Sequence, residues 1–433
     1  MNNGKKKRVL IITYYWPPSG GAGVQRWLKL SKYLVQLDTE VHILTVDPKY
    51  ASYSSRDQSL IREVSPHIKV HTSYSFELIN LYGQMMGKDK IPTGGFSNVT
   101  NKGLLQRSAM WVRSNLFHPD PRVGWRRFGV RKALSLLKEF HFDAIITSSP
   151  PHSTQLIGLD VKRKYPQLRW IADLRDPWTD IFYYDILNKA AFAKRIDQRL
   201  ERKVLEQCDH LITISAGFRS VFAAKLAAEL KGKFSIIPNG FDPADFSSPP
   251  PPKDSGFTIT YTGTIADSYQ PESIFDAVKK LQQLHSGEGI RLKFVGILAP
   301  SLRDYLTVND ITFESIPPVS HQKVVKIQRA AHILLLVSPE MNGGDFIIPG
   351  KAFEYLASGN PILGLANRGS ETDQLLQLTN SGKCFGRDES EGIFNFIAEQ
   401  FDRYRNGQPH QTDPKKIGSY SRVAQAKAVW ELI

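Results

Sequence analysis

Short apolar runs alternate with helical stretches along most of this 433-residue chain, and this alternation limits the folds that the chain can adopt. It starts with an apolar run at Arg8–Thr13, a Gly/Pro/Ser loop at Pro17–Gly23, a helical stretch at Val24–Leu37 and a second apolar run at Val41–Val46. Further apolar runs lie at Asp143–Thr147, Arg169–Asp173 and His210–Ser215. Strands that alternate with helices form a parallel sheet covered on both faces. The sequence therefore predicts an α/β protein.

Four consecutive prolines within Ser247–Gly256 make the clearest break in this pattern, because proline is excluded from helix interiors and central strands. A strand that runs into a turn, Phe234–Phe246, precedes them. A fresh alternation follows, with apolar runs at Thr258–Tyr261, Leu292–Val295, His332–Val337 and Pro361–Leu365 and helices from Ser273 and Gly350. At roughly 100–200 residues per domain, the length allows two or three domains. We predict two α/β domains with a boundary near residues 235–257.

The formal net charge of +14 favours anionic partners, namely nucleotide phosphates, anionic lipids or nucleic acid, and charge alone does not choose among them. The two cysteines, Cys208 and Cys384, do not indicate a disulfide framework. The basic N-terminus precedes an apolar run, Val9–Ile12, that is too short for a signal peptide. No stretch approaches the ~18 apolar residues of a membrane-spanning helix. We expect a cytoplasmic protein, and peripheral attachment to the inner face of a membrane stays open.

Residues 102–138 are strongly basic, with Asp120 as their one acid. Trp111, Phe117, Trp125 and Phe128 are interleaved with the cations, which are Lys102, Arg107, Arg113, Arg122, Arg126, Arg127, Arg131, Lys132 and Lys138. Tryptophans among basic side chains suit the interface of an anionic membrane, so peripheral membrane binding is one interpretation. A solvated basic surface is an equally good one. Nucleic-acid binding is a third, although the segment carries no recognised nucleic-acid-binding motif.

The loop PPSGGAG, Pro17–Gly23, follows the first predicted strand and precedes a helix. Gly20 and Gly21 lack Cβ atoms, so a ligand can approach the backbone, and free N–H groups at the helix start would face an anion. The spacing differs from the G-x-G-x-x-G fingerprint of dinucleotide sites, and no Walker-type lysine follows. Contact with a phosphate and an ordinary tight turn are both compatible with this loop.

In the segment Ile347–Leu363, a proline and a glycine start a predicted helix and Gly359 ends it. Lys351 and Glu354 share a face near the helix N-terminus. The helix start and the Lys351 ammonium would attract a diphosphate, and the Glu354 carboxylate would accept hydrogen bonds from the two hydroxyls of a ribose. A surface ion pair between these two side chains is the alternative.

The predicted strand in Ile171–Asp180 ends in charged residues, among them Arg175 and Asp176. Ligands of open α/β sheets bind outside the carboxyl ends of the strands. Arg175 could therefore bind a phosphate and Asp176 a hydroxyl, and a self-paired cluster of salt bridges is equally compatible. His152, after another predicted strand, is a candidate polar contact, although a histidine in a loop is more often solvated. No two aspartates lie two residues apart, so the D-x-D metal-diphosphate motif is absent and we expect no metal site.

The motifs GGAG, LRDPW, LITIS, IIPNGFD, YTGTI and GKAFEYLASGNPIL occur in an order that resembles the retaining nucleotide-sugar glycosyltransferases of the GT-B fold, family 4. The resemblance covers nearly the whole chain, and Ile236–Asp242 and Phe353–Pro361 are its most specific pieces. It implies two Rossmann-like, doubly wound domains facing a cleft. The implied parts are an acceptor-side domain over 1–235, a nucleotide-sugar-binding domain over 236–415, and a C-terminal helix within 416–433 that crosses back to the first domain.

The resemblance also implies roles for single residues. Glu354 matches the family's ribose-binding second glutamate. Gly20 and Gly21 match the glycine-rich loop near the donor diphosphate. Gly263 matches the glycine after the first strand of the second domain. The family's first glutamate falls on Phe346, with Asp345 as its acidic neighbour. Thr264 replaces the family's basic residue after the strand glycine, so we expect Lys351 to supply that cation.

The implied function is retaining, metal-independent transfer of a hexose-like sugar from a nucleoside-diphosphate sugar to a glycan or lipid-linked acceptor, in cell-surface polysaccharide biosynthesis. No cofactor is implied beyond the donor substrate. The protein would mainly position the reactants and stabilise charge on the diphosphate, with Arg175 and Asp176 near the acceptor. The alternatives are a GT-B relative that does not transfer, such as a nucleotide-sugar epimerase, and a nucleic-acid-binding protein that uses residues 102–138.

Overall fold

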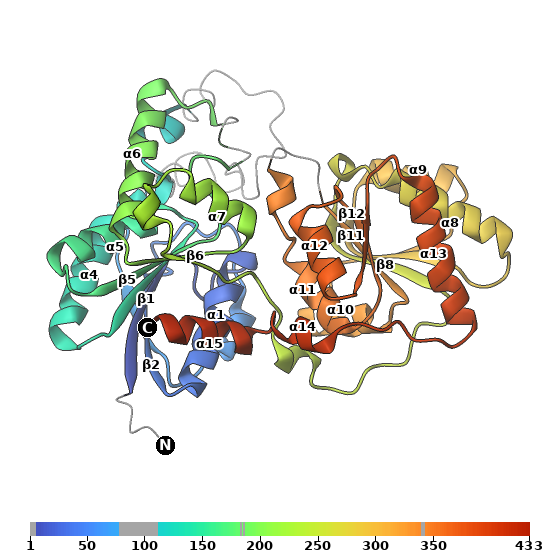
Figure 1. Ribbon diagram of the computed structural model, residues 1–433, viewed down its shortest axis with the longest axis horizontal. Helices are drawn as coiled ribbons and strands as arrows, with labels where there is room; N and C mark the ends of the chain where they lie inside the picture. Colours follow the sequence, from blue (N-terminus) through green and yellow to red (C-terminus); the bar gives the residue numbers. More distant parts are fainter. Residues whose placement is uncertain (1–5, 78–110, 182–183, 185–186, 339–342) are drawn as a thin grey trace. The chain divides into compact units, whose positions relative to one another are not determined.

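The computed structural model describes residues 6–77, 111–181, 184, 187–338 and 343–433 (Figure 1). The chain divides into two compact units. The first unit consists of the chain up to Pro238 together with Gln425–Ile433, and the second of Asn239–Ala424. Each unit is built around one sheet with helices packed against it.

In the described part of the first unit, the sheet has seven parallel strands in the order β3-β2-β1-β4-β5-β6-β7. The strands are β1 (Lys7–Thr13), β2 (Thr39–Val46), β3 (Lys69–Ser73), β4 (Ala144–Ser149), β5 (Arg169–Leu174), β6 (His210–Thr213) and β7 (Phe234–Ile236). β1 pairs with β2 on one side and with β4 on the other, so the strand order reverses at β1. In doubly wound sheets, ligands bind beside such a reversal, outside the carboxyl ends of the strands.

The main helices of this unit are α1 (Ala22–Gln36), α4 (Arg126–Glu139), α5 (Ser153–Lys164), α6 (Ala191–Gln207), α7 (Ala216–Ala223) and most of α15 (Arg422–Leu432). Right-handed crossovers place α4, α5 and α6 on one face of the sheet and α1 on the other. α5 lies between α4 and α6 and contacts both (Figure 1). Lys7 of β1 donates a hydrogen bond to Trp430 O (2.8 Å) and lies over its ring, which joins α15 to this unit.

The packing of α5 on the sheet depends on a glycine. Gly158 faces Trp170 of β5, whose ring is fully buried and whose Nε1 donates to Thr147 Oγ1 (2.8 Å). A Cβ at position 158 would lie 2.4 Å from the Trp170 ring. Any larger residue at 158 would therefore force the ring or the helix to shift.

In the described part of the second unit, six parallel strands have the order β10-β9-β8-β11-β12-β13, so the order again reverses at the first strand, β8. The strands are β8 (Thr258–Ile265), β9 (Arg291–Leu298), β10 (Phe313–Ile316), β11 (Ile333–Val337), β12 (Ile362–Leu365) and β13 (Gly382–Phe385). The helices are α8 (Glu272–Leu284), α9 (Pro300–Val308), α10 (His321–Ala330), α11 (Lys351–Ser358), α12 (Glu371–Leu378), α13 (Ser390–Arg405) and α14 (Pro414–Gly418). One apolar core joins α8, α9 and α13 to the sheet, and another joins α11 and α12 to it.

Both units thus have the doubly wound α/β arrangement that the sequence predicts. The predicted apolar runs are strands, and Gly359 ends α11 with φ 76°, as expected for a glycine cap. The strands β3, β10 and β13, which the apolar runs do not indicate, lie at sheet edges. No described helix is long and apolar enough to cross a membrane.

Candidate functional site

Lys351 and Gly263 lie next to one another where β8 ends in the second unit. Lys351 is the first residue of α11, and its Nζ donates to Tyr261 Oη and Thr262 O (both 2.8 Å) and lies 3.9 Å from the centre of the Tyr261 ring. Gly263 has φ 115°, and a Cβ there would lie 3.0 Å from Lys351 Nζ. The glycine therefore leaves the ammonium beside bare backbone at the strand end.

Burial lowers the pKa of Lys351 to about 8, and the charge of Glu354 opposes this shift. The amine is therefore mostly protonated at pH 7. Thr264, at the position of the family's basic residue, is exposed on the same strand. The Lys351 ammonium of α11 thus lies beside Gly263, the neighbour of Thr264, where the resemblance to family 4 implies a basic residue on the strand.

Glu354 lies one turn further along α11, and two side chains of α10 hold its carboxylate. His321 Nε2 lies 3.0 Å from Oε1, and Gln328 Nε2 donates to Oε2 (3.1 Å). Burial alone would raise the pKa of Glu354, but the hydrogen bonds from His321 and Gln328 and the charge of Lys351 lower it below its usual value. The carboxylate is therefore ionised at neutral pH. Its side chain is 29% exposed, so a ligand can still reach it.

The surface ion pair that the sequence leaves open does not form, because Lys351 and Glu354, both described, bond to other partners. His321 and Gln328 are functional candidates that no sequence motif indicates. Their i, i+7 spacing on α10 would have placed them on one face, although it does not reveal that this face meets α11.

Asp345 forms its hydrogen bond with a residue outside α10 and α11. It is exposed in the short 3₁₀ helix Gly344–Phe346, and its Oδ1 accepts a hydrogen bond from Asn367 (3.0 Å), in the loop after β12. Among the described residues it has no hydrogen bond to Lys351 or Glu354. A donor-binding role for Asp345 stays a prediction.

The glycine loop of the first unit folds back on a neighbouring segment. The Gly20 N–H donates to Ser55 O (3.0 Å), and a Cβ at Gly20 would lie 2.9 Å from Ser55 Oγ. Gly21, with φ 85°, precedes α1, whose start has no side-chain cap and no acid in its first turn among the described residues. Both glycines therefore allow the backbone to form this turn. The first turn of α1 contains no acidic side chain.

Asp173, at the end of β5, is a structural carboxylate. Arg26 of α1 forms two hydrogen bonds with it (3.0 and 3.1 Å), and both side chains are buried. Trp27 Nε1 (2.8 Å) and Ser148 Oγ (2.9 Å) also donate to Asp173. Arg26 further donates to Ile237 O (2.9 Å) near the end of the first unit. A buried charge with this many partners holds elements together and is not free for a ligand.

Arg175 and Asp176, the predicted acceptor-side residues, differ in their surroundings. Arg175 donates to the carbonyls of Ser149 (3.0 Å) and Gly23 (3.3 Å), which joins β5 to β4 and α1, and burial lowers its pKa. Burial raises the pKa of Asp176, and the charge of Arg175 opposes that shift. The Asp176 carboxylate has no hydrogen-bond partner among the described residues. Asp173 and Asp180 form ion pairs, but with Arg26 and Lys225 from outside the segment. Among the described residues, the charged side chains of this segment therefore form no ion pair with one another.

His152 is not solvated, contrary to the expectation for a loop histidine. Its side chain is 8% exposed and stacks on Trp178, with ring centroids 5.1 Å apart. Burial lowers the pKa of His152 to about 3, so the ring is neutral at physiological pH. Neither ring nitrogen has a hydrogen-bond partner within the described residues.

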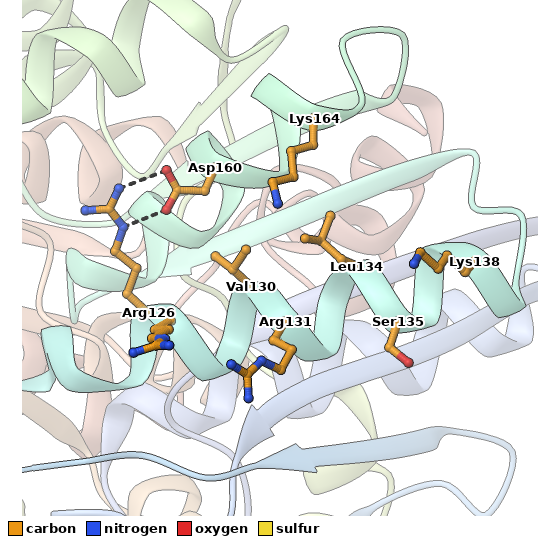
Figure 2. Close-up of a pocket in the computed structure, with 9 residues that line it drawn as sticks. Arg126, Val130, Arg131, Leu134, Ser135, Lys138, Asp160 and Lys164 are labelled. Atoms are coloured by element: carbon orange, nitrogen blue, oxygen red, sulfur yellow. Dashed lines mark hydrogen bonds and ion pairs between the residues drawn. The ribbon is translucent and has the colours of Figure 1, made fainter.

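Part of the basic segment 102–138 forms a helix that lines a pocket. Lys102 and Arg107, at the start of the segment, lie outside the described residues. Residues 126–138 form most of α4, and this helix and α5 line a pocket of about 740 Å³ (Figure 2). Arg126 makes a double hydrogen bond to Asp160 (2.7 and 2.8 Å). Other cations of the pocket have no ion-pair partner among the described residues: Arg127, Arg131, Lys138 and Lys164.

The prediction that the tryptophans of this segment suit a lipid interface is wrong for Trp125. Trp125 is fully buried, and its Nε1 donates to Ser73 Oγ (2.8 Å). Asp120 is also structural, because it accepts hydrogen bonds from the Ser153 N–H (2.8 Å) and hydroxyl (2.9 Å) at the start of α5. Trp111 is 49% exposed.

The described residues contain no group of three or more His, Cys, Asp or Glu side chains that could hold a metal ion. Metal independence stays a prediction.

Comparisons with known proteins support the class that this geometry suggests. Residues 101–245 match the model of Glycosyltransferase Family 4. The chain is similar to sucrose-phosphate synthase from Thermosynechococcus elongatus, with 14% identity, a TM-score of 0.57 and 98% of each chain covered. It is similar to HepE from Anabaena in complex with UDP-glucose, with 12% identity, a TM-score of 0.57 and 98% of each chain covered.

It is also similar to a UDP-N-acetylglucosamine 2-epimerase, with 13% identity, a TM-score of 0.51, and 99% of this chain and 95% of that one covered. No curated protein matches the sequence. The likeness to these structures shows the GT-B fold. Among proteins of that fold, the chain resembles glycosyltransferase family 4.

Proposed function

We propose that this protein is a retaining, metal-independent glycosyltransferase of the hexosyltransferase type. Its donor is a nucleoside-diphosphate sugar, its acceptor a glycan or a lipid-linked glycan, and its place is in cell-surface polysaccharide biosynthesis. The observation that carries the proposal is the arrangement of Lys351, Gly263 and Glu354 between α11 and the end of β8. The likeness to HepE in complex with UDP-glucose supports a nucleotide-sugar donor.

The donor would use these three residues in different ways. The Lys351 ammonium and the free N–H groups at the start of α11 would neutralise the diphosphate, which Gly263 allows to approach the backbone. Glu354 accepts hydrogen bonds only, so it suits the two hydroxyls of a ribose. In the first unit, Gly20 and Gly21 would present the uncapped start of α1 to a phosphate, and Asp345 is a further proposed donor contact.

In the proposed reaction, the bond between the anomeric carbon and the donor phosphate breaks, and the acceptor oxygen bonds to the same face of that carbon. The acceptor proton passes to the leaving phosphate. Lys351 would stabilise the charge that develops on the diphosphate. Asp176, whose carboxylate lacks a partner among the described residues, would orient an acceptor hydroxyl, and Arg175 would hold the loop that carries it.

A thermal-shift panel of nucleoside diphosphates and nucleotide sugars tests the donor. A ligand that binds only the native state adds about 2.7 kcal/mol of stability at a hundredfold its dissociation constant. We expect one nucleoside diphosphate and its sugar to raise the melting temperature. No stabilisation by any nucleotide would contradict the proposal.

The donor found in this way is then incubated with and without acceptor glycans, and the configuration of the product is read by NMR. Transfer with retention is the expected result. Isomerisation of the donor without an acceptor would establish the epimerase alternative, which the likeness to the 2-epimerase keeps in view.

A further inference from the structure

The outer face of the helical layer α4–α5–α6 carries two stripes of exposed cations. On α4, Arg127, Arg131 and Lys138 are exposed and lie on one side of the helix. On α6, Arg195, Arg199 and Arg202 are exposed and form a similar stripe. None of the six has an ion-pair or hydrogen-bond partner within the described residues. α5 lies between the two helices, and its Lys164 adds charge to the pocket beside α4 (Figure 2).

The acids of this layer cancel only part of these charges. On α6, Asp197 and Glu201 are buried and face inward, where Asp197 contacts His118 (3.0 Å) and Glu201 contacts Lys225 (2.6 Å). On α5, Asp160 is held by Arg126. The exposed acids are Glu139, at the end of α4, and Glu206, on the α6 stripe. The six cations of the two stripes outnumber these acids, so the outer surface of the layer carries a net positive charge.

Large apolar side chains are exposed at one end of the same layer. Trp111 (49%), Leu116 (58%) and Phe192 (46%) are exposed, and so are Val112 and Ile196. They come from the helical turns at residues 111–116 and from the start of α6, which are joined because Asn115 Oδ1 accepts a hydrogen bond from the Ala190 N–H (2.6 Å). Phe192 and Ile196 lie on the same stripe of α6 as Arg195 and Arg199.

Cations and exposed apolar side chains together decide the kind of partner. A nucleic acid would use the cations, but it leaves exposed leucine, isoleucine and valine without a role. A bilayer with anionic headgroups uses both, because basic side chains meet the headgroups while aromatic and aliphatic side chains enter the acyl boundary. This is the composition of surfaces that lie on a membrane without crossing it.

We propose that the outer face of α4–α5–α6, together with the apolar side chains at 111–116 and at the start of α6, docks on an anionic lipid bilayer. This surface differs from the one that the sequence suggests within residues 102–138. Trp125 is buried, and one of the two stripes of cations lies on α6, outside that segment. This inference deepens the proposed function, since a docked enzyme would meet a lipid-linked acceptor, but its test does not depend on transfer.

The test is flotation of the full-length protein with vesicles of phosphatidylglycerol and phosphatidylcholine, or of phosphatidylcholine alone, at low and physiological salt. We expect binding to the anionic vesicles only, weakened by salt. Each basic side chain near an anionic surface is worth about 1 kcal/mol, or about fivefold in affinity. Arg131→Glu/Arg199→Glu should therefore weaken binding by at least about 25-fold.

Two further variants separate the contributions. Lys383→Glu/Lys415→Glu makes the same change in net charge at exposed lysines of the second unit and should bind vesicles like the wild type. Phe192→Ser/Ile196→Ser keeps the charge, and it should remove the part of the binding that persists at physiological salt.

Nucleoside-diphosphate binding, measured by calorimetry on each variant, should stay unchanged and reports whether the variant is folded. Equal binding to both kinds of vesicle, or equal loss in the control variant, would overturn the docking surface and leave the donor site standing. Binding to duplex DNA in a gel shift without binding to vesicles would overturn it in favour of a nucleic acid.

Discussion

The carboxylate of Glu354 combines a position near a helix N-terminus with two hydrogen bonds from α10. Glu354→Gln keeps the size of the side chain but removes its charge and one acceptor. Hydrogen bonds to a charged group are worth about 1.5–3 kcal/mol, so affinity for the nucleoside diphosphate should fall about tenfold to a hundredfold. The free energy of unfolding should change by less than about 1 kcal/mol, the size of one interaction at a helix end.

Calorimetric titration and thermal melts of the same variant separate binding from stability. Glu399→Gln is the matched control, because Glu399 is a half-exposed carboxylate of α13 that pairs with Arg403. Unchanged affinity together with a lower melting temperature in Glu354→Gln would leave that carboxylate a structural role only. An equal loss of affinity in Glu399→Gln would show that the loss does not come from the donor site.

Lys351 should make donor binding depend on pH. Burial lowers its pKa to about 8 from 10.5, so the folded chain loses the proton first as the pH rises. Between these two values the unfolded chain binds more protons, and the stability contributed by this residue rises with pH. Affinity for a diphosphate should change in the opposite direction, falling by up to about tenfold per pH unit above pH 8, because the cation is lost.

Titrations at pH 7, 8, 9 and 10 measure this effect. Lys351→Met should bind about tenfold to a hundredfold more weakly at pH 7, as expected for a lost hydrogen bond to a charged group, and should show no decline from pH 8 to 10. Lys383→Met, at an exposed position on β13, should behave like the wild type. A decline that persists in Lys351→Met would assign the titration to another group.

Sequence patterns found the local parts of the candidate site and missed the distant ones. Lys351 and Glu354 are three residues apart on one helix, so spacing alone places them together. The pairing of Glu354 with His321, or of Asp173 with Arg26, joins residues far apart in the chain, and no local pattern reveals it. The burial of Trp125 was missed for the same reason, because residues distant in sequence cover this side chain.

At the level of secondary structure, the close packing of α5 on β5 makes Gly158 a sensitive position. Gly158→Ala places a methyl group 2.4 Å from the Trp170 ring, which is fully buried and bonded to Thr147. Overpacking of this kind costs about 1–3 kcal/mol, more than the gain of up to about 1 kcal/mol in helix propensity. Unfolding in urea should show a lower midpoint.

Gly129→Ala in α4 is the matched variant, because its Cβ would meet the terminal methyl group of Ile157, at 2.5 Å. That methyl group can rotate away, so the loss of stability should be smaller than in Gly158→Ala. Equal stability of Gly158→Ala and the wild type would show that the ring or the helix adjusts at little cost.

Strands in the middle of each sheet were predictable, whereas three of the four edge strands were not, β7 being the exception. β1 and β4 are buried on both faces, so they appear as continuous apolar runs. β3, with the sequence KVHTS, is mostly exposed and polar at the sheet edge, so it has no such run. β10 is also a half-exposed edge strand, and β13 starts with a glycine, which is not typical of a strand.

At the scale of the whole molecule, the proposed chemistry needs no divalent ion. Transfer should survive thorough treatment with EDTA, because protein cations and helix starts would neutralise the diphosphate in place of a metal. The assay uses a chelated enzyme with and without added magnesium or manganese. Activity that disappears on chelation and returns with either ion would contradict the prediction.

The division of the chain has a consequence for how such a gene can be inherited. The second unit is one continuous stretch, whereas the first is completed by residues 425–433. A single recombination event cannot exchange the first unit whole, but a double crossover near codons 238 and 425 would replace the entire second unit as a cassette. The proposed contacts of Lys351 and Glu354 with the donor would then pass between lineages while the membrane-docking helices descend separately. Mosaic genes with both junctions at these two places are the trace that such exchange would leave.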